Sequence, residues 1–242
     1  MNVIFIAWQD PESRQWAPVG RLSKENSEFS FVYTQGAEEV PNFTPFGRMK
    51  DLHAIYKSDT LFPLFSNRVL PKSRPEYSDY MNWLGLNESN YDEMEELSRT
   101  AGLRATDSLE LFPCPLPTSQ NIYELFFFSR GLRHMYSENQ ERANNLKEGE
   151  QLFLMQDFQN SYDGMALMMR TNDPVSLVGY TPRYYSGEVS ELIKSNKPEN
   201  IVVTVEKVNQ NAPLQYRVLC KLKTKWPANF MPCSDAQYKA LA

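Results

Sequence analysis

The feature that most constrains the fold is a series of short apolar runs in the second half of this 242-residue chain. Each run is rich in β-branched and aromatic residues, which is typical of strands. A helix is predicted over Ser186–Ser195, because Val189, Leu192 and Ile193 share one face at spacings of three and four. Several short strands around one helix predict a small barrel or a strongly curved sheet. The predicted strands are Tyr123–Ser129, Gln151–Met155, Ala166–Arg170, Val175–Tyr180, Ile201–Val208 and Gln215–Leu222.

The first half of the chain combines predicted strands with one predicted helix. The helix is expected to be capped by Asn87 or Ser89 and to stop at Gly102. Four acids near its start suit the helix dipole, and a solvated helix face is the expected environment for them, with a catalytic or metal-binding pair as the alternative. These acids are Asp92, Glu93, Glu95 and Glu96, and the predicted strands are Val3–Trp8, Trp16–Leu22 and Phe29–Tyr33.

A domain boundary is predicted near residue 118. The stretch Leu111–Pro117 contains three prolines, which fix φ and lack an amide donor, so it is excluded from helix interiors and central strands. Residues 1–119 carry 11 Lys and Arg against 17 Asp and Glu, whereas residues 120–242 carry 14 against 13. A net charge of −5 disfavours general binding to duplex DNA, which depends on neutralising many phosphates. Binding to DNA ends or to proteins remains compatible with this charge.

Composition also limits the cellular setting and the chemistry. No run approaches the roughly 20 apolar residues of a membrane span, so we expect no membrane partner. The wide spacing of Cys114, Cys220 and Cys233 favours a reducing compartment, and we expect a cytoplasmic protein. Two histidines without C-x-x-C or H-x-x-x-H spacing predict no metal site, and no cofactor is expected. The chain is therefore expected not to be an enzyme; a hydrolase site built from scattered acids is the weaker alternative.

Four segments of the second half carry a family resemblance. They are Gly131-Leu132-Arg133-His134, Gly149–Leu154, Asn160-Ser161-Tyr162-Asp163-Gly164-Met165-Ala166 and Val178-Gly179-Tyr180-Thr181-Pro182. Together, over about residues 120–225, they resemble the HIRAN domain. The resemblance implies a β-barrel-like, OB-like fold that grips the end of single-stranded DNA in helicase-associated relatives. It also implies that Arg133, His134, Tyr162 and Asp163 surround the terminal nucleotide and its 3′-hydroxyl.

The chemistry of these four residues suits that role. The Tyr162 ring offers a sequence-tolerant stacking surface, worth about 1–3 kcal/mol per base. The Asp163 carboxylate accepts a hydrogen bond from a hydroxyl but repels a phosphate, which selects a free 3′-hydroxyl. Arg133 is expected to neutralise the nearest internal phosphate, and His134 to stack or donate. The alternative is that Asp163 only accepts backbone amides within its turn. A phosphate track is predicted to continue over Arg170, Arg183, Lys221, Lys223 and Lys225.

Three positions depart from the HIRAN pattern. Met165 replaces the usual asparagine, Ser161 replaces the usual proline, and His134 replaces the tyrosine of the DNA-binding relative. The histidine reduces the area available for stacking. No aromatic residue near Val205 aligns with the later aromatic of that relative.

Three segments of the first half keep the order and spacing of a second family. Val19–Leu22, Phe29–Tyr33 and Leu64–Pro71 make residues 2–100 similar to the first N-terminal subdomain of HipA-type toxin kinases. No ATP-binding glycine loop and no H-R-D-like or D-F-G-like segment follows, so phosphoryl transfer is not implied. The resemblance implies a docking surface for a kinase-like or helix-turn-helix protein, in a bacterial toxin–antitoxin or defence setting.

The sequence thus predicts an α+β protein with two domains. A small mixed α/β docking domain is expected over residues 1–118, and a HIRAN-like domain with one helix over residues 119–242. The expected function is non-enzymatic binding of single-stranded or damaged DNA ends, while the first domain docks a protein partner. The alternative is an antitoxin-like adaptor in which both domains bind proteins and DNA has no role.

Overall fold

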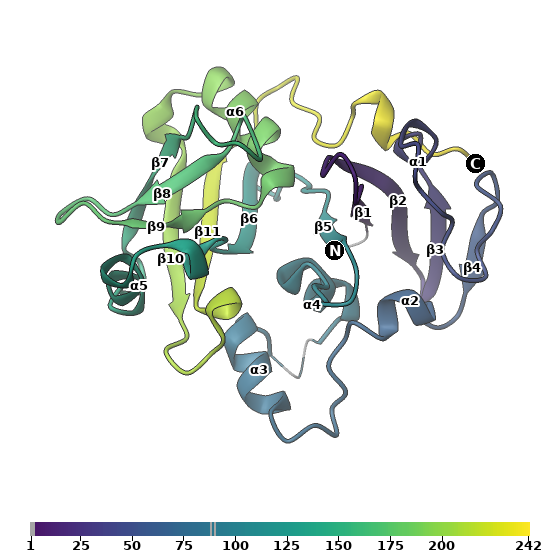
Figure 1. Cartoon of the computed structure of the whole chain (residues 1–242), viewed down its shortest axis with the longest axis horizontal. Helices are drawn as coiled ribbons and strands as arrows, with labels where there is room; N and C mark the ends of the chain where they lie inside the picture. The colour runs from purple at the N-terminus through teal and green to yellow at the C-terminus, as the bar shows by residue number, and fades with distance from the viewer. Residues whose placement is uncertain (1–2, 88, 90) are drawn as a thin grey trace. The chain divides into compact units, whose positions relative to one another are not determined.

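The computed structural model describes residues 3–87, 89 and 91–242, and the chain divides into two units, each with its own sheet (Figure 1). The first unit comprises Met1–Ser78, Asn87–Cys114 and Met231–Ala242, and the second comprises Asp79–Leu86 and Pro115–Phe230. Two sheets with few helices form a mixed α/β protein, and the second sheet is a half-barrel. The chain passes between the units more than once, and the division of domains at residue 118 stays a prediction.

The sheet of the first unit is antiparallel, with strand order β4-β3-β2-β1-β5. The three strands predicted from composition are confirmed, and two short strands were not predicted. The proline-rich stretch contributes only an edge strand that ends at Pro113, as the missing amide donors require. The strands are β1 (Val3–Gln9), β2 (Trp16–Glu25), β3 (Glu28–Tyr33), β4 (Tyr56–Ser58) and β5 (Leu109–Pro113).

Helices α1 (Gly36–Glu39), α2 (Pro63–Ser66) and α4 (Glu93–Thr100) belong to this unit. The predicted cap of α4 was wrong. Asp92 has an extended backbone and its Oδ1 accepts the amide of Met94 at 2.8 Å, so α4 begins several residues after Asn87 and Ser89. The helix ends where Ala101 and Gly102 adopt positive φ, next to the predicted stop.

The acids of α4 are not all solvated, contrary to the expectation for this cluster. Glu96 is fully buried and accepts hydrogen bonds from the Leu70 amide at 2.9 Å and the Tyr91 hydroxyl at 2.7 Å. Nearby in the chain, the buried Arg68 forms a bidentate pair with Asp107, at 2.6 and 3.2 Å. Because buried charges need such partners, we interpret both sets of contacts as structural: Glu96 holds the segment of Leu70 against α4, and Arg68 holds the loop of Asp107.

The last twelve residues of the chain, 231–242, complete the first unit. Thr34 forms an antiparallel bridge with Ala240, and the ring of Tyr238 meets the ring of Phe5 edge-on, with 4.9 Å between centroids. Nothing in the local sequence of this segment predicts that it returns to the first sheet.

The second unit contains a six-stranded antiparallel sheet in the order β6-β11-β10-β7-β8-β9. Its edges meet at one isolated bridge, in which Arg130 and Tyr180 exchange two backbone hydrogen bonds of 2.9 Å. All six predicted strands are confirmed: β6 (Ile122–Phe128), β7 (Gln151–Gln156), β8 (Leu167–Arg170), β9 (Leu177–Tyr180), β10 (Val202–Val208) and β11 (Val218–Lys225).

Helix α6 (Ser186–Ser195) has the predicted bounds and buries Val189 and Leu192 against the half-barrel (Figure 1). The prediction of a single helix was wrong, because α5 (Ser137–Asn144) also forms and most of α3 (Tyr77–Leu84) lies in this unit. No helix among residues 3–87, 89 and 91–242 combines the length and the apolar character needed to cross a membrane.

Candidate nucleic-acid interface

The turn between β7 and β8 is fixed by its own polar groups. The Asp157 amide donates to the Ala166 carbonyl at 2.9 Å and closes the turn at its base. Inside it, Asn160 Oδ1 accepts the amides of Tyr162 and Asp163 at 3.0 and 3.1 Å, while its Nδ2 donates to Asp157 at 3.0 Å. The backbone is therefore held in one conformation, whereas the Tyr162 side chain is 79% exposed. The Tyr162 ring therefore projects into solvent from a turn whose backbone is fixed.

Asp163 combines a structural role with remaining acceptor capacity. Its Oδ1 accepts the Met165 amide at 2.9 Å, as the alternative interpretation of this turn expected. Its Oδ2 accepts the Ser186 hydroxyl at 3.1 Å, which connects the turn to the first residue of α6. Each carboxylate oxygen has two lone-pair sites, so the half-buried carboxylate retains sites for a ligand hydroxyl.

Tyr180 connects this turn to the other edge of the half-barrel. Its hydroxyl donates to Asp157 Oδ2 at 2.9 Å, and its backbone forms the bridge to Arg130. Burial, followed by the bond to Asp157, raises the pKa of Tyr180. Hydrogen bonds from Asn160 and then Tyr180 lower the pKa of Asp157. At neutral pH the pair is therefore a neutral phenol donating to a carboxylate.

Two glycines allow the turn after β6 to lie against β9. Gly131 has φ of 75°, and a Cβ there would lie 3.3 Å from the ring of Tyr180. Gly179 has φ of 102°, and a Cβ there would lie 2.0 Å from Ser129 Oγ. Only glycine satisfies both the backbone conformation and the close approach at position 179. The close approach of the two backbone segments thus explains why glycine occupies both positions.

The turn that follows Gly131 presents the predicted basic residues. The short helix η2 (Leu132–His134) buries Leu132 and leaves Arg133 and His134 exposed. Arg133 Nε donates to His134 Nε2 at 2.9 Å, so the two side chains lie side by side. Through Tyr180, the structure links this turn to the turn of Tyr162 and Asp163.

Arg170 and Arg183 lie farther along the chain but on the same unit. The Arg170 guanidinium is 4.8 Å from the centroid of the Phe153 ring, and its Nη1 donates to the Thr171 carbonyl at 2.9 Å. Arg170 shares a sheet face with Met168, the cross-strand partner of Tyr180, because alternate residues of a strand share a face. The carbonyl of the half-buried Arg183 accepts the Ser186 amide, while its guanidinium forms no hydrogen bond or ion pair with the residues that the structure describes.

Comparison with known proteins finds one family that is similar to most of this unit. Residues 122–227 match the model of the HIRAN domain. We refer to this segment as the HIRAN domain below, after the family whose model it matches. Two solved structures are similar at 17% identity. One is a Lactobacillus plantarum protein, where the match covers 42% of this chain and 95% of that chain with a TM-score of 0.32. The other is the HIRAN domain of human HLTF, where the match covers 45% of this chain and 84% of that chain with a TM-score of 0.30. No curated protein matches the chain. HIRAN domains bind DNA, so the match supports nucleic-acid binding in general.

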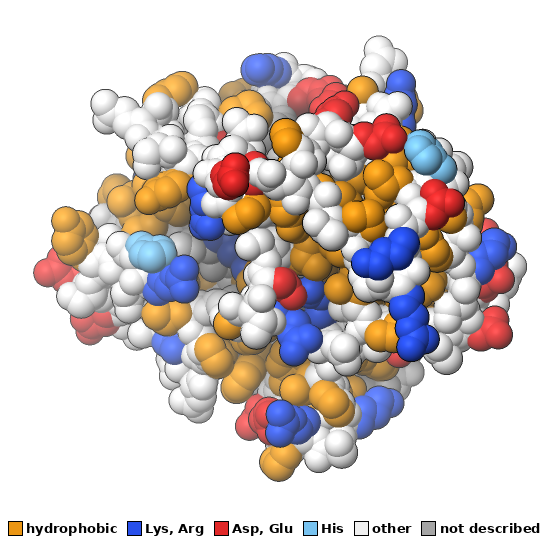
Figure 2. All heavy atoms as spheres, turned by 45° about the vertical axis from the view of Figure 1, so that its right-hand side comes forward, with side chains coloured by type: hydrophobic (Ala, Val, Ile, Leu, Met, Phe, Trp, Pro, Cys, Tyr) orange, Lys and Arg blue, Asp and Glu red, His pale blue; other side chains and the backbone are white. Residues whose placement is uncertain are grey.

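Two of the three lysines that were predicted to extend the phosphate track lie next to an acid. Lys221 pairs with Glu124 at 3.2 Å and lies 4.7 Å from the centroid of the Phe126 ring. Lys223 approaches the same carboxylate at 3.9 Å. On the face shown in Figure 2, Lys and Arg side chains form several separate groups with Asp and Glu among them. The Glu124 carboxylate therefore offsets part of the positive charge of Lys221 and Lys223.

Three residues of this interface were not predicted from sequence. Asp157 and Tyr180 form a hydrogen bond with each other across 23 positions of the sequence, and sequence spacing does not predict such a bond. Phe158, which is 78% exposed, was not singled out, although an aromatic residue inside a polar turn was visible in the sequence. The structure therefore adds an aromatic surface to the one predicted at Tyr162.

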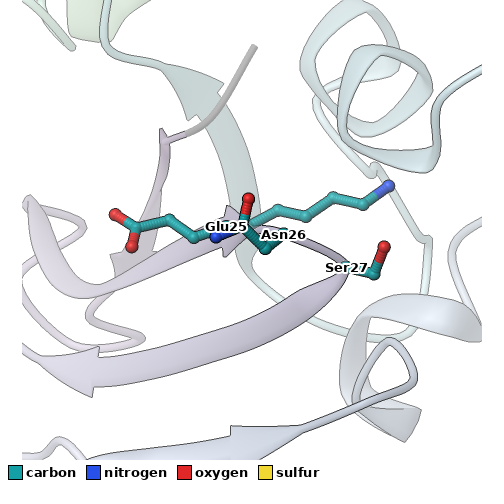
Figure 3. Close-up of a pocket in the computed structure, with 4 residues that line it drawn as sticks. Glu25, Asn26 and Ser27 are labelled. Atoms are coloured by element: carbon teal, nitrogen blue, oxygen red, sulfur yellow. The ribbon is translucent and has the colours of Figure 1, made fainter.

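Other candidate chemistry does not converge in the described part of the chain. Residues 3–87, 89 and 91–242 contain no group of three or more His, Cys, Asp or Glu placed to hold a metal ion. Burial raises the pKa of the Cys220 thiol to about 12, which keeps it protonated. A polar hollow at the β2–β3 turn is lined by Lys24, Glu25, Asn26 and Ser27, but the side chains of Glu25 and Ser27 point away from each other (Figure 3).

Proposed function

We propose that the HIRAN domain of this chain binds the 3′-hydroxyl end of single-stranded or damaged DNA, without catalysing a reaction. The observation that carries the proposal is the exposed Tyr162 ring on a turn whose backbone Asn160 holds in place, directly beside the Asp163 carboxylate. A preorganised site binds more tightly because less conformational entropy is lost on binding.

Each residue has a defined role in this proposal. Tyr162 stacks on the terminal base, which contributes about 1–3 kcal/mol. Asp163 accepts the terminal hydroxyl, and its charge disfavours a terminal phosphate. Arg133 pairs with the nearest internal phosphate, while His134 lies beside it and stacks or donates. Arg170 and Arg183 supply further positive charge to the strand.

The test is fluorescence anisotropy with two single-stranded oligonucleotides that differ only in a 3′-hydroxyl or a 3′-phosphate. The wild type is expected to prefer the hydroxyl, and Asp163→Asn to lose that preference, because the amide keeps an acceptor but carries no charge. Glu191→Gln, an exposed neutralisation on α6, is the matched control and should keep the preference. Equal binding of both ends by the wild type would contradict the proposal.

We further propose that the first unit docks a protein partner and that the protein works in the cytoplasm. The similarity to the HipA-type subdomain supports a kinase-like or helix-turn-helix partner in a toxin–antitoxin or defence system. The exposed Ile55 adjoins the edge strand β4, which pairs only with β3 in the described sheet. Edge strands can accept a further strand from a partner.

Size-exclusion chromatography with a purified candidate partner tests this docking role. A complex that forms with the wild type and with Tyr162→Ala, but not with Ile55→Asp, would place docking on the first unit. A complex lost in Tyr162→Ala would instead place the partner on the HIRAN domain. If DNA binding is absent while the complex forms, the adaptor alternative replaces the DNA proposal.

A further inference from the structure

Exposed apolar side chains are concentrated in one short segment of the HIRAN domain. In the described part of the chain, nine large hydrophobic side chains are exposed, and four of them fall within residues 155–165. Single exposed apolar residues are common on soluble proteins, but a local concentration marks a contact surface. The four are Met155, Phe158, Tyr162 and Met165, with exposures of 42%, 78%, 79% and 49%.

Phe158 projects from the same fixed turn as Tyr162. It follows Asp157, whose carboxylate accepts hydrogen bonds from Asn160 and Tyr180, and the Asn160 amide donates to the Asp157 carbonyl at 3.1 Å. The polar network therefore anchors the backbone on both sides of Phe158. Its side chain is 78% exposed and contacts no other aromatic ring among the described residues, so most of the ring is accessible to a ligand.

The kind of ligand follows from the chemistry around this ring. Two separate aromatic rings four positions apart offer π-faces, which every base can use regardless of sequence. Arg133 lies three residues after Arg130, which bridges to Tyr180 at the end of β9, and Arg183 lies three residues after Tyr180. Both arginines can supply charge for the phosphates between the bases. A single DNA strand offers bases to the two rings and phosphates to the arginines, so it matches this combination better than a helix face or an extended peptide does.

We propose that Phe158 is a second stacking surface, so that the site holds at least two consecutive unpaired nucleotides of a DNA strand. This inference rests on the proposed function, in which Tyr162 holds the terminal base. Phe158 then stacks on a base further from the 3′ end. The additional ring adds stacking area to a site in which His134 stands where the DNA-binding relative has a tyrosine.

The experiment measures the affinity of the full chain for fluorescein-labelled oligothymidylates of two and six nucleotides with a 3′-hydroxyl. Phe158→Ala is expected to weaken binding of the hexamer about 5- to 150-fold, the range that corresponds to loss of one stacked base. Phe158→Tyr keeps a ring and should bind within about threefold of the wild type. Val175→Ala, an exposed apolar residue on the β8–β9 turn, is the control and should bind like the wild type.

The outcomes separate the two proposals. If the wild type binds and prefers a 3′-hydroxyl while Phe158→Ala matches Val175→Ala, the second stacking surface is refuted and the end-binding site stands. If the wild type shows no preference for the hydroxyl, the end-binding function fails. A Phe158→Ala protein that loses a protein partner but binds DNA normally would assign the ring to protein docking and overturn the inference. Circular dichroism of each variant checks that the fold is retained.

Discussion

Replacement of Asn160 by alanine tests whether the turn of the HIRAN domain is held in advance for its ligand. The side chain makes three hydrogen bonds, two to the amides of Tyr162 and Asp163 and one to Asp157. A typical hydrogen bond contributes about 0.5–1.5 kcal/mol net, and exposed bonds lie at the lower end of that range. Asn160→Ala should therefore destabilise the protein by about 1–3 kcal/mol, mainly by making local opening of the turn less costly.

Amide hydrogen exchange followed by NMR reads this loss directly. In Asn160→Ala the amides of Tyr162 and Asp163 lose their acceptor and should exchange faster, because local opening becomes less costly. Affinity for a 3′-hydroxyl oligonucleotide should fall about 5- to 100-fold, since the turn must now be ordered on binding. Asn211→Ala replaces an exposed asparagine outside the turn and is the matched control. Unchanged exchange at both amides, together with affinity equal to that of Asn211→Ala, would refute the argument.

Three further perturbations follow from the structure. Gly179→Ala should lower the free energy of unfolding by about 2–4 kcal/mol in chemical denaturation, because residue 179 has φ of 102° and a methyl group there would lie 2.0 Å from Ser129 Oγ. The control is Gly164→Ala, whose methyl group would have no atom within 4 Å and which should cost under about 1 kcal/mol. Arg68→Ala should lower the free energy of unfolding by about 3–5 kcal/mol, since the Arg68 side chain is 1% exposed and Asp107 would lose its cation. Arg74→Ala, at an exposed position, should change it by under about 0.5 kcal/mol. Equal effects of the two substitutions would contradict a structural role of the Arg68–Asp107 pair. The pKa of Asp157 lies below its ordinary value of 3.8, so its carboxylate stabilises the fold above about pH 4 and loses this effect as pH falls through the lowered pKa. The difference in stability between the wild type and Asp157→Asn should accordingly shrink in acid titrations, and a constant difference would count against this interaction.

Local composition predicted the half-barrel because each strand carries its own signal. The six apolar runs and the spacing of Val189 and Leu192 in α6 are short-range patterns, and all of them form the expected elements. Helix α5 was missed because only Ala143 of its eight residues is buried, which leaves no apolar periodicity to detect. Short β4 and β5 depend on neighbouring strands and not on their own composition.

The candidate site was partly predictable for a similar reason. Tyr162 and Asp163 belong to one turn, and their neighbourhood is set by adjacent residues such as Asn160. By contrast, the contact between Tyr180 and Asp157 and the burial of Glu96 depend on how distant segments pack. Sequence patterns indicate which residues are polar or aromatic, but long-range packing decides which of them meet.

The most direct test of the account is the ratio of dissociation constants for two otherwise identical single strands, one ending in a 3′-phosphate and one in a 3′-hydroxyl, measured with the full chain at fixed salt. Recognition of the hydroxyl by the Asp163 carboxylate predicts weaker binding of the phosphate end by about tenfold or more, since a buried or half-buried carboxylate strongly disfavours a second anion. A ratio of one, or tighter binding of the phosphate end, would contradict recognition of a 3′-hydroxyl by this HIRAN domain.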